Sequence, residues 1–308
     1  MEPKTVYALG FFDGVHLGHG ALLKACAALA ESLGCRSGAV TFADHPQALI
    51  SGKNPGLIST VADRTAMMKN AYAIEHIVVL PFDKATMTMH YMTFFRMLLS
   101  KYGACGLVCG HDFRFGNRGE GTPQLLQEAC REAGIPCIVV PEQRLDGITV
   151  SSTYIRQLLK AGDMEQAARF LGHPHLYTGI VVPGKHLGST LGFPTANLLF
   201  PNTMLCPKKG VYASVAIVDG QRYMAVTNVG NRPTVGGGYT TVEAWLLDYS
   251  GDLYGSRITL EFHKYLRPEQ KFDTLEDLRR EVEKNGEETR KFFQKNRFLT
   301  LYNWENSC

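Results

Sequence analysis

The stretch Gly10-Phe-Phe-Asp-Gly-Val-His-Leu-Gly-His19 constrains the fold of this chain more than any other. An apolar run over residues 6–12 predicts a buried parallel strand, and apolar residues at helical spacing follow over residues 21–33. Glycines let a backbone approach a phosphate, and a helix N-terminus offers it free N–H groups and a partial positive charge. Two imidazoles at this spacing, His16 and His19, can donate hydrogen bonds to a phosphoryl group under attack. The stretch therefore predicts a polyphosphate site. We expect this site to be formed by Gly10, Phe12, Asp13, Gly14 and Gly18.

Two other interpretations of this stretch stay open. Asp-Gly is a common turn pair, so the loop could be purely structural. His16 and His19 could belong to a metal site, although no third ligand follows at the spacing typical of zinc. The strand before the loop and the helix after it favour phosphate binding over both.

Length and composition are those of an ordinary globular protein. The 308 residues suit one large or two average domains, and 45% hydrophobic with 20% charged residues is typical. The net charge of +3 is too small and too dispersed to indicate a nucleic-acid partner. No apolar run is long enough to span a bilayer, and the first residues lack the pattern of a signal peptide. We therefore expect a cytoplasmic protein with no membrane partner.

The chain has eight cysteines, and none of them forms a Cys-x-x-Cys pair. Most lie within apolar segments, which is typical of small buried hydrophobic residues. Disulfides are rare in the cytoplasm, so we expect free thiols.

The two halves of the chain follow different patterns. Up to about residue 140, apolar runs alternate with helical segments, which predicts a parallel sheet with both faces covered. The expected strands are residues 6–11, 39–42, 76–80, 106–109 and 137–140. After Gly172, short β-type runs between turn residues predict an antiparallel barrel or sandwich, followed by a helix. These runs cover residues 179–182, 211–218, 223–228, 241–248 and 257–262, and the helix covers residues 275–294. We expect domains of residues 1–172 and 173–308.

Two helices of the first half carry signals at their ends. Gly34 stands where a glycine commonly closes a helix, after residues 21–33. A second helix over residues 123–133 has Thr122 as its N-cap, and Gly134 follows its end.

A second loop of interest is Gly110-His-Asp-Phe-Arg-Phe-Gly116. Asp112, Phe113 and Phe115 offer polar and aromatic surface, and the loop follows an expected strand at the edge where parallel sheets bind ligands. The sequence therefore indicates a contact with a ring-bearing substrate. Taken alone, the same residues also suit an irregular surface loop.

The third segment is Val150-Ser-Ser-Thr-Tyr-Ile-Arg156. Ser151, Ser152 and Thr153 suit the cap of a following helix. Arg156, near the start of that helix, opposes the helix dipole unless an anion is bound. This conflict predicts a phosphate contact.

These three segments, in this order, resemble the nucleotidylyltransferase superfamily, specifically its FMN adenylyltransferase branch. The first is similar to its His-x-Gly-His signature. The second is similar to a segment that helps to hold FMN and the nucleotide, and the third to a motif that contacts the triphosphate. The resemblance implies that an FMN phosphate oxygen attacks the α-phosphorus of ATP and releases pyrophosphate. His16 and His19 would then steady the α- and β-phosphates, Ser152 and Arg156 the leaving group, and Asp112 the substrate.

The second half carries Gly179-x-Val-x-x-Gly184 and Gly188-Ser-Thr-Leu-Gly-Phe-Pro-Thr-Ala-Asn197. Gly184 and Gly188 leave room for phosphates against the backbone. Thr195 and Asn197 present oxygen ligands on one face of an extended segment, which suits Mg²⁺ bridged to phosphates. A purely structural turn is the alternative.

This phrase resembles the Gly-Phe-Pro-Thr-Ala-Asn signature of riboflavin kinases. The resemblance implies that Glu243 is the base for the riboflavin 5′-hydroxyl, and that Arg267 lines the flavin site. The sequence departs from the family's pattern at two positions. Ser189 stands where the family often has arginine, and Lys185 could supply the phosphate contact instead. Asn285 stands where an acidic residue is common.

Nearly the whole chain thus resembles the bacterial bifunctional riboflavin kinase and FAD synthetase family. This implies a Rossmann-like nucleotidylyltransferase domain of α/β class, then a β-barrel riboflavin kinase domain with a terminal helix. Riboflavin, FMN and ATP would be the substrates, Mg²⁺ the metal and FAD the final product. We expect a monomer or a weak homo-oligomer. Two alternatives stay open: an FMN adenylyltransferase whose barrel only binds flavin, and a flavin sensor without turnover.

Overall fold

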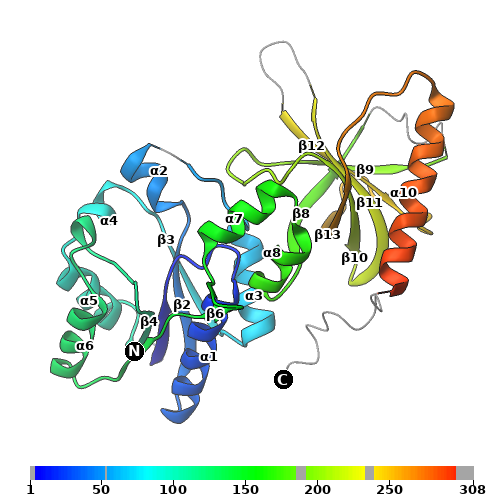
Figure 1. Ribbon diagram of the computed structural model, residues 1–308. Helices are drawn as coiled ribbons and strands as arrows, with labels where there is room; N and C mark the ends of the chain where they lie inside the picture. Colours follow the sequence, from blue (N-terminus) through cyan, green and yellow to red (C-terminus); the bar gives the residue numbers. More distant parts are fainter. Residues whose placement is uncertain (1–3, 53, 185–191, 233–238, 296–308) are drawn as a thin grey trace. The chain divides into compact units, whose positions relative to one another are not determined.

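The computed structural model describes residues 4–52, 54–184, 192–232 and 239–295. These residues form two compact units (Figure 1). The first contains the described residues up to Leu57 together with Arg64–Ser151, and the second contains Ile58–Asp63 with the described residues from Ser152 onward. Lys185, Gly188 and Ser189, named above for the kinase site, lie outside the described residues.

The first unit is built on a five-stranded parallel sheet, as the sequence predicts. Its strand order is β3-β2-β1-β4-β5, so the chain starts in the middle and runs outward in both directions. The strands are β1 (Thr5–Leu9), β2 (Arg36–Phe42), β3 (His76–Leu80), β4 (Ala104–Gly110) and β5 (Cys137–Val140).

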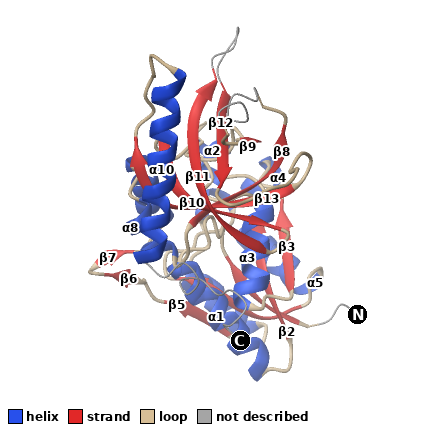
Figure 2. Ribbon diagram, turned by 90° about the vertical axis from the view of Figure 1, so that its right-hand side faces the viewer, coloured by secondary structure: helices blue, strands red, loops and turns tan. Residues whose placement is uncertain are grey.

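Helices cover both faces of this sheet (Figures 1 and 2). Helix α1 (Leu17–Ser32) packs against β1, β2 and β4 on one face. Helices α5 (Tyr91–Ser100) and α6 (Pro123–Glu132) pack on the other, where their apolar residues join one core with Tyr7 and Leu9. The remaining short elements are α2 (Pro46–Ser51), α3 (Val61–Tyr72), α4 (Lys84–Thr88), the 3-10 turn Asn117–Gly119, β6 (Arg144–Leu145) and β7 (Ile148–Thr149).

Local sequence signals predict the ends of the helices correctly, but they place the end of the first strand too late in the chain. Gly34 has φ of 61° after α1, and the Thr122 side chain accepts the N–H of Leu125 at 3.2 Å before α6. Both predictions are confirmed. Strand β1, however, stops at Leu9 rather than continuing into the apolar Phe11 and Phe12. The reason is the turn itself, because Phe12 has φ of 55° and cannot continue an extended ladder.

The second unit is a closed, six-stranded antiparallel barrel in the order β10-β11-β12-β9-β8-β13. The barrel that the family resemblance implies is confirmed, and it decides between the barrel and the sandwich that the residue pattern alone left open. Its strands are β8 (His175–Val182), β9 (Thr195–Leu199), β10 (Gly210–Val218), β11 (Gln221–Arg232), β12 (Tyr239–Leu246) and β13 (Arg257–Arg267). Among the described residues of this unit, the helices α7 (Ser152–Ala161), α8 (Met164–Leu171) and α10 (Leu275–Lys295) accompany the barrel.

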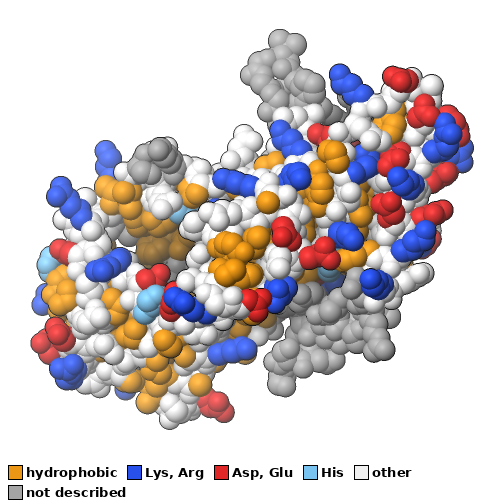
Figure 3. Space-filling model, in the orientation of Figure 1, with side chains coloured by type: hydrophobic (Ala, Val, Ile, Leu, Met, Phe, Trp, Pro, Cys, Tyr) orange, Lys and Arg blue, Asp and Glu red, His pale blue; other side chains and the backbone are white. Residues whose placement is uncertain are grey.

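Helix α10 lies along the outside of the barrel against β10 and β11 (Figure 1). Its Phe293 is buried and packs with Ala213 and Val215 of β10. Charged side chains of both signs alternate over its outer side (Figure 3). This amphipathic pattern is the reason that the helix could be predicted from the sequence. No helix in the described ranges has both the length and the apolar character needed to cross a bilayer.

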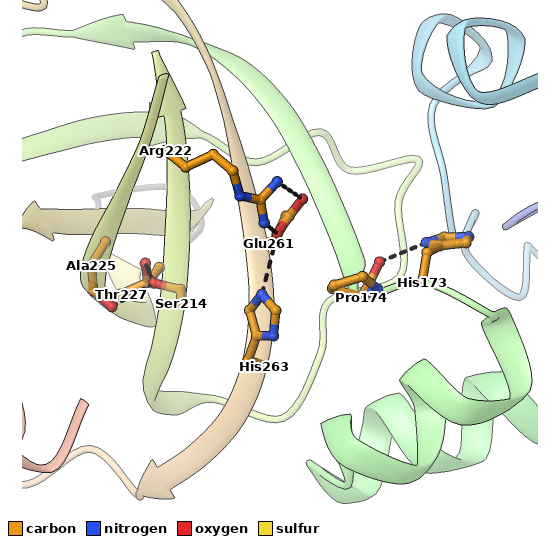
Figure 4. A network of polar contacts seen from close by, with 8 residues as sticks. All are labelled: His173, Pro174, Ser214, Arg222, Ala225, Thr227, Glu261 and His263. Atoms are coloured by element: carbon orange, nitrogen blue, oxygen red, sulfur yellow. Dashed lines mark hydrogen bonds and ion pairs between the residues drawn. The ribbon is translucent and has the colours of Figure 1, made fainter. Parts of the chain in front are cut away.

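The barrel carries a buried ion-pair network (Figure 4). Glu261 on β13 is 1% exposed, and its carboxylate accepts hydrogen bonds from Arg222 at 2.5 and 3.1 Å and contacts His263 at 3.2 Å. His263 also packs edge-on against Phe293 of α10. Burial acts to raise the pKa of Glu261, but the bonds from His263 and Arg222 outweigh it and hold the pKa below its ordinary value.

The seven cysteines in the described part of the chain are free thiols, and Cys26, Cys109 and Cys130 are buried. The Cys26 thiol donates to the backbone oxygens of Val6 and Gly38, so it bonds helix α1 to the sheet. Burial raises the pKa of this thiol to about 11, which keeps it protonated.

We expect Glu261→Gln to lower the free energy of unfolding by about 2 kcal/mol at pH 7, since it leaves Arg222 without a carboxylate partner. Because the folded pKa of Glu261 is depressed, its stabilisation is present above the unfolded pKa and is lost as the pH falls through the folded value. The difference between the two proteins in urea titrations should therefore shrink below about pH 4. The exposed pair of Glu287 with Lys291 provides the control, since Glu287→Gln should change little. A gap that stays constant down to low pH would contradict this account.

Candidate functional site

The first candidate site is the turn between β1 and α1. His16 is the N-cap of α1, and its Nδ1 accepts the backbone N–H of His19 at 3.2 Å. The two imidazole rings stack with centroids 3.6 Å apart and planes within 13°. Phe12 contacts the ring of His19 edge-on at 5.2 Å. The turn therefore brings both predicted histidines together as one stacked pair.

The backbone of this turn adopts rare conformations. Phe12, Gly14 and Val15 all have positive φ, and the non-glycine residues among them pay conformational strain. A Cβ added at Gly18 would lie 3.2 Å from the His16 ring, and one at Gly10 would lie 3.1 Å from the Phe12 ring. A larger residue at either position would therefore press on these rings and require them to shift by a few tenths of an ångström.

The hydrogen bond at the helix cap fixes the tautomer of His16. Because Nδ1 accepts a backbone N–H, it carries no proton, and the proton of the neutral ring lies on Nε2. This tautomer is inferred from the hydrogen bonding. It gives His16 a donor that is not used by the cap.

Arg64 on α3 is a residue near this turn that we did not predict from the sequence. It is fully buried, its guanidinium lies 4.5 Å from the centre of the Phe11 ring, and its Nη2 donates to the backbone oxygen of Phe42. Burial lowers the pKa of Arg64, and the carboxylates of Asp13 and Asp44 oppose that shift. The sequence did contain an indication of its burial. Arg64 lies three and four residues before the buried Met67 and Met68, so all three share the inner face of α3.

The residues that were predicted to bind substrate in the loop after β4 differ in how far they are exposed. Phe115 is 8% exposed and belongs to the core, whereas Phe113 is half-buried and Asp112 is exposed. The rings of Phe113 and Phe115 stack with centroids 5.4 Å apart. A backbone bridge between Phe115 and Gly121 closes the loop. Phe115 thus supports Phe113 from the core side.

The segment at residues 150–156 begins α7 at Ser152, as expected for a capping sequence. Ser151 is the last residue of the first unit in this part of the chain, whereas Ser152, Thr153 and Arg156 belong to the second. Arg156 is 8% exposed and shares the buried side of α7 with Ile155 and Leu159.

The second candidate site is a cavity of about 380 Å³ in the second unit, within the range of small-molecule sites. Aromatic and aliphatic side chains form much of its wall, and several polar groups converge on it. The lining residues are Phe193, Thr195, Val211, Val226, Asn228, Glu243, Trp245, Arg267, Glu269, Gln270, Phe272, Leu278, Val282 and Asn285.

Three neighbouring strands place polar residues in one row beside this cavity. Glu243 on β12 pairs with Asn228 on β11 and with Asn197 on β9. Asn197 Nδ2 donates to the backbone oxygen of Thr195 at 3.2 Å, which leaves Oδ1 as the acceptor end of the amide. A Cβ at Gly184 would lie 2.3 Å from Asn197 Nδ2, so the backbone there packs directly on this amide. Glu243, Thr195, Asn197 and Gly184 are therefore brought together.

Sequence reasoning missed most of the wall of this cavity. Phe193, Trp245 and Phe272 supply flat apolar surface, and Asn228 and Glu269 supply polar groups. The alternation of exposed and buried residues along β11 and β12 would have indicated which side chains share a face, but not which of them line one cavity.

Comparison with known proteins agrees with this division into two units. Residues 1–154 match the FAD synthetase family, and residues 171–293 match the riboflavin kinase family. Fold and sites together thus define a two-domain transferase of flavin nucleotides. A bifunctional riboflavin kinase/FMN adenylyltransferase of Bacillus subtilis (strain 168) is 32% identical over 300 residues, covering 95% of this chain and 93% of that protein.

Two further proteins show similarity over most of their length. The protein of the same name from Pseudomonas fluorescens is 36% identical over 276 residues, covering 89% of this chain and 88% of its own. A solved structure titled as a macrolide-efflux protein from Streptococcus pneumoniae has a TM-score of 0.84 and 28% identity, covering 94% and 95% of the two chains. The chain belongs to the family of bifunctional riboflavin kinase/FMN adenylyltransferases.

We expect the neutral ring of His16 to carry its proton on Nε2, because Nδ1 accepts the N–H of His19. Long-range proton–nitrogen correlation spectra of ¹⁵N-histidine-labelled protein would identify the tautomer, with a His16→Asn variant to assign the signals. A resonance pattern with the proton on Nδ1 would contradict the observed cap.

Proposed function

We propose that this chain phosphorylates riboflavin to FMN with ATP in its barrel, and then adenylylates FMN with a second ATP in its N-terminal unit. The products of the second step are FAD and pyrophosphate. The observation that carries the proposal is the position of Glu243, which lines an aromatic cavity beside Thr195 and pairs with Asn197. The family membership of both units supports it.

In the barrel, Glu243 is suited to act as the general base. A carboxylate at the cavity wall can accept the proton of the riboflavin 5′-hydroxyl as the oxygen attacks the γ-phosphorus of ATP. The bond between the γ-phosphorus and the β,γ-bridging oxygen then breaks, and ADP leaves. Gly184, with Lys185 and Gly188, would hold the phosphates, while Phe193, Trp245 and Arg267 would form the flavin wall.

The residues present fit a Mg²⁺ ion at Thr195 and Asn197. Their hydroxyl and amide oxygens are hard ligands two residues apart on one face of β9. Gly184 packs so closely on Asn197 that a Cβ would clash there, which leaves the amide little freedom. Mg²⁺ commonly has few protein ligands and is otherwise held by waters and substrate phosphates. When bound, Mg²⁺ would neutralise charge on those phosphates.

In the N-terminal unit, no side chain needs to form a covalent bond. An FMN phosphate oxygen attacks the α-phosphorus of ATP, and pyrophosphate leaves. His16, donating from Nε2, and His19 would stabilise the charge that develops on the phosphate oxygens. The backbone at Gly10, Phe12, Asp13, Gly14 and Gly18 would surround the triphosphate at the start of α1. Ser151, Ser152, Thr153 and Arg156 would contact the leaving group.

FMN would bind at the loop after β4. The half-buried Phe113 would offer its ring to the isoalloxazine, with Phe115 stacked behind it and Asp112 orienting the polar edge. The functional boundary between the activities would lie near residue 172. We further propose a cytoplasmic enzyme that acts as a monomer or weak homo-oligomer, with no nucleic-acid or membrane partner.

The first experiment is a time course with riboflavin, ATP and Mg²⁺, with the flavins separated by chromatography. FMN should appear first and FAD later. FAD from added FMN, without any product from riboflavin, would support the alternative of an adenylyltransferase whose barrel only binds flavin.

We expect Glu243→Gln to lower kcat for FMN formation by roughly 10²–10⁴-fold, because the base is lost. Adenylylation of added FMN should stay unchanged and serves as an internal control. Glu269→Gln is the matched variant, since Glu269 lines the same cavity without facing Asn197 in the strand register. Equal losses in both variants would contradict a specific role for Glu243.

We expect His19→Asn to slow FAD formation from FMN by roughly 10²-fold or more, because one preorganised donor to the phosphates is removed. Phosphorylation of riboflavin should be retained. Loss of both activities together would indicate unfolding rather than a role in adenylyl transfer, and thermal unfolding of the variant distinguishes the two.

A further inference from the structure

Arg267 closes one side of the cavity at the end of β13. It lines the cavity wall, and its side chain is only 16% exposed. Its Nη1 donates to the backbone oxygen of Pro268 at 3.0 Å, and its guanidinium lies 5.8 Å from the centre of the Phe272 ring. A cation in so sheltered a place needs an anionic partner.

Helix α10 supplies that partner through two residues one turn apart. Glu281 Oε1 lies 3.1 Å from Arg267 Nε, and Asn285 Oδ1 accepts from the same Nε at 3.0 Å. Asn285 is 1% exposed and its Nδ2 donates to Glu281 Oε1 at 3.2 Å. The Nε–H of Arg267 therefore donates to the amide of Asn285, the carboxylate of Glu281 forms an ion pair with the same nitrogen, and the acid and the amide also bond to each other.

The chemistry of this triad allows one amide orientation. Asn285 must turn its oxygen to the guanidinium and its NH₂ to the carboxylate, because the reverse would face donor to donor and acceptor to acceptor. Asn285 lines the cavity with Arg267, whereas Glu281 is not among the residues that line it. The negative charge that balances Arg267 thus comes from a residue that does not face the cavity.

Electrostatics point in the same direction. Burial lowers the pKa of Arg267, and the carboxylates of Glu281 and then Glu288 favour its charged form. Lys284 Nζ also lies 3.9 Å from Glu281, but it is well exposed to solvent. Removing the Glu281 charge would leave the guanidinium with neutral oxygens as its close partners and would take the carboxylate acceptor from the Asn285 amide.

We propose that Glu281 is a positioning residue for flavin binding: acting through Asn285, it holds the Arg267 guanidinium in place at the cavity wall. Glu281 supplies one negative charge and Asn285 supplies one amide. On this proposal, an amide at position 281 and an acid at position 285 would hold Arg267 equally well. This inference rests on the proposed function of the cavity as the riboflavin site.

The test is a charge swap within the triad, read by equilibrium binding of riboflavin through its fluorescence. Glu281→Gln should weaken binding about tenfold, since the charged partner of Arg267 is lost. Asn285→Asp alone should also weaken it about tenfold, because two carboxylates would then meet where a 3.2 Å hydrogen bond now lies. The double variant Glu281→Gln with Asn285→Asp restores one acid and one amide. It should bind within about twofold of the parent protein.

Glu283→Gln is the control on the same helix, since Glu283 pairs with Arg279 at 3.2 Å on the exposed side and should leave binding unchanged. In steady-state assays of FMN formation, Glu281→Gln should raise KM for riboflavin while kcat changes less than about twofold. Thermal unfolding of each variant accompanies the binding data. If Asn285→Asp does not fold, the riboflavin affinity of Glu281→Gln is compared directly with that of the double variant.

Rescue by the double variant would support the positioning role. A double variant as weak as Glu281→Gln, or a Glu281→Gln variant that binds like the parent protein, would overturn it while leaving the proposed kinase activity intact. A parent protein that binds no riboflavin would overturn the proposed function of the cavity and this inference with it.

Discussion

Closure of the barrel's hydrogen-bonded ladder is the constraint on which the C-terminal site depends. Strand β12 is paired on both sides, by β11 and by β9, so neither neighbour can slide without breaking the other ladder. A slip of one residue would turn Glu243 to the opposite face of its strand. Closure therefore fixes the row of Asn228, Glu243 and Asn197 more firmly than an open sheet would, and it encloses the cavity beside them.

The N-terminal site depends on a different principle. Parallel strands all end at the same edge of the sheet, so the loops after β1, β2 and β4 meet there without any direct pairing. The turn after β1 is strained at Phe12 and Val15, which have positive φ without being glycine. Strain of about 1–3 kcal/mol per residue persists only where the surroundings hold it. Here the buried Asp13 and the stacked rings of His16 and His19 provide that hold.

The sequence predicted the features that depend on local patterns. The parallel strands, the Thr122 cap, Gly34 after α1 and the amphipathic α10 all follow from spacing and capping. The end of β1 was predicted too late, because the apolar Phe11 and Phe12 look like strand residues but serve the turn. The candidate site motifs could be named because each lies within a short segment. The residue pattern left a barrel and a sandwich open, and the family resemblance implied the barrel that the structure has. The aromatic wall of the cavity could not be predicted, since Phe193, Trp245 and Phe272 meet only through long-range pairing.

Two buried arginines depend on charged partners that the sequence alone did not identify. Arg64 lies fully buried behind the turn after β1, and Arg267 lies in the wall of the barrel cavity. In each case burial lowers the pKa of the guanidinium and nearby carboxylates oppose that shift, Asp13 and Asp44 for the first and Glu281 and Glu288 for the second. A buried cation is stable only where such partners stand, and those partners come from distant segments. Arg267 itself could be named from the motif around it, but the carboxylates that balance its charge, and those that balance Arg64, come from other segments of the chain.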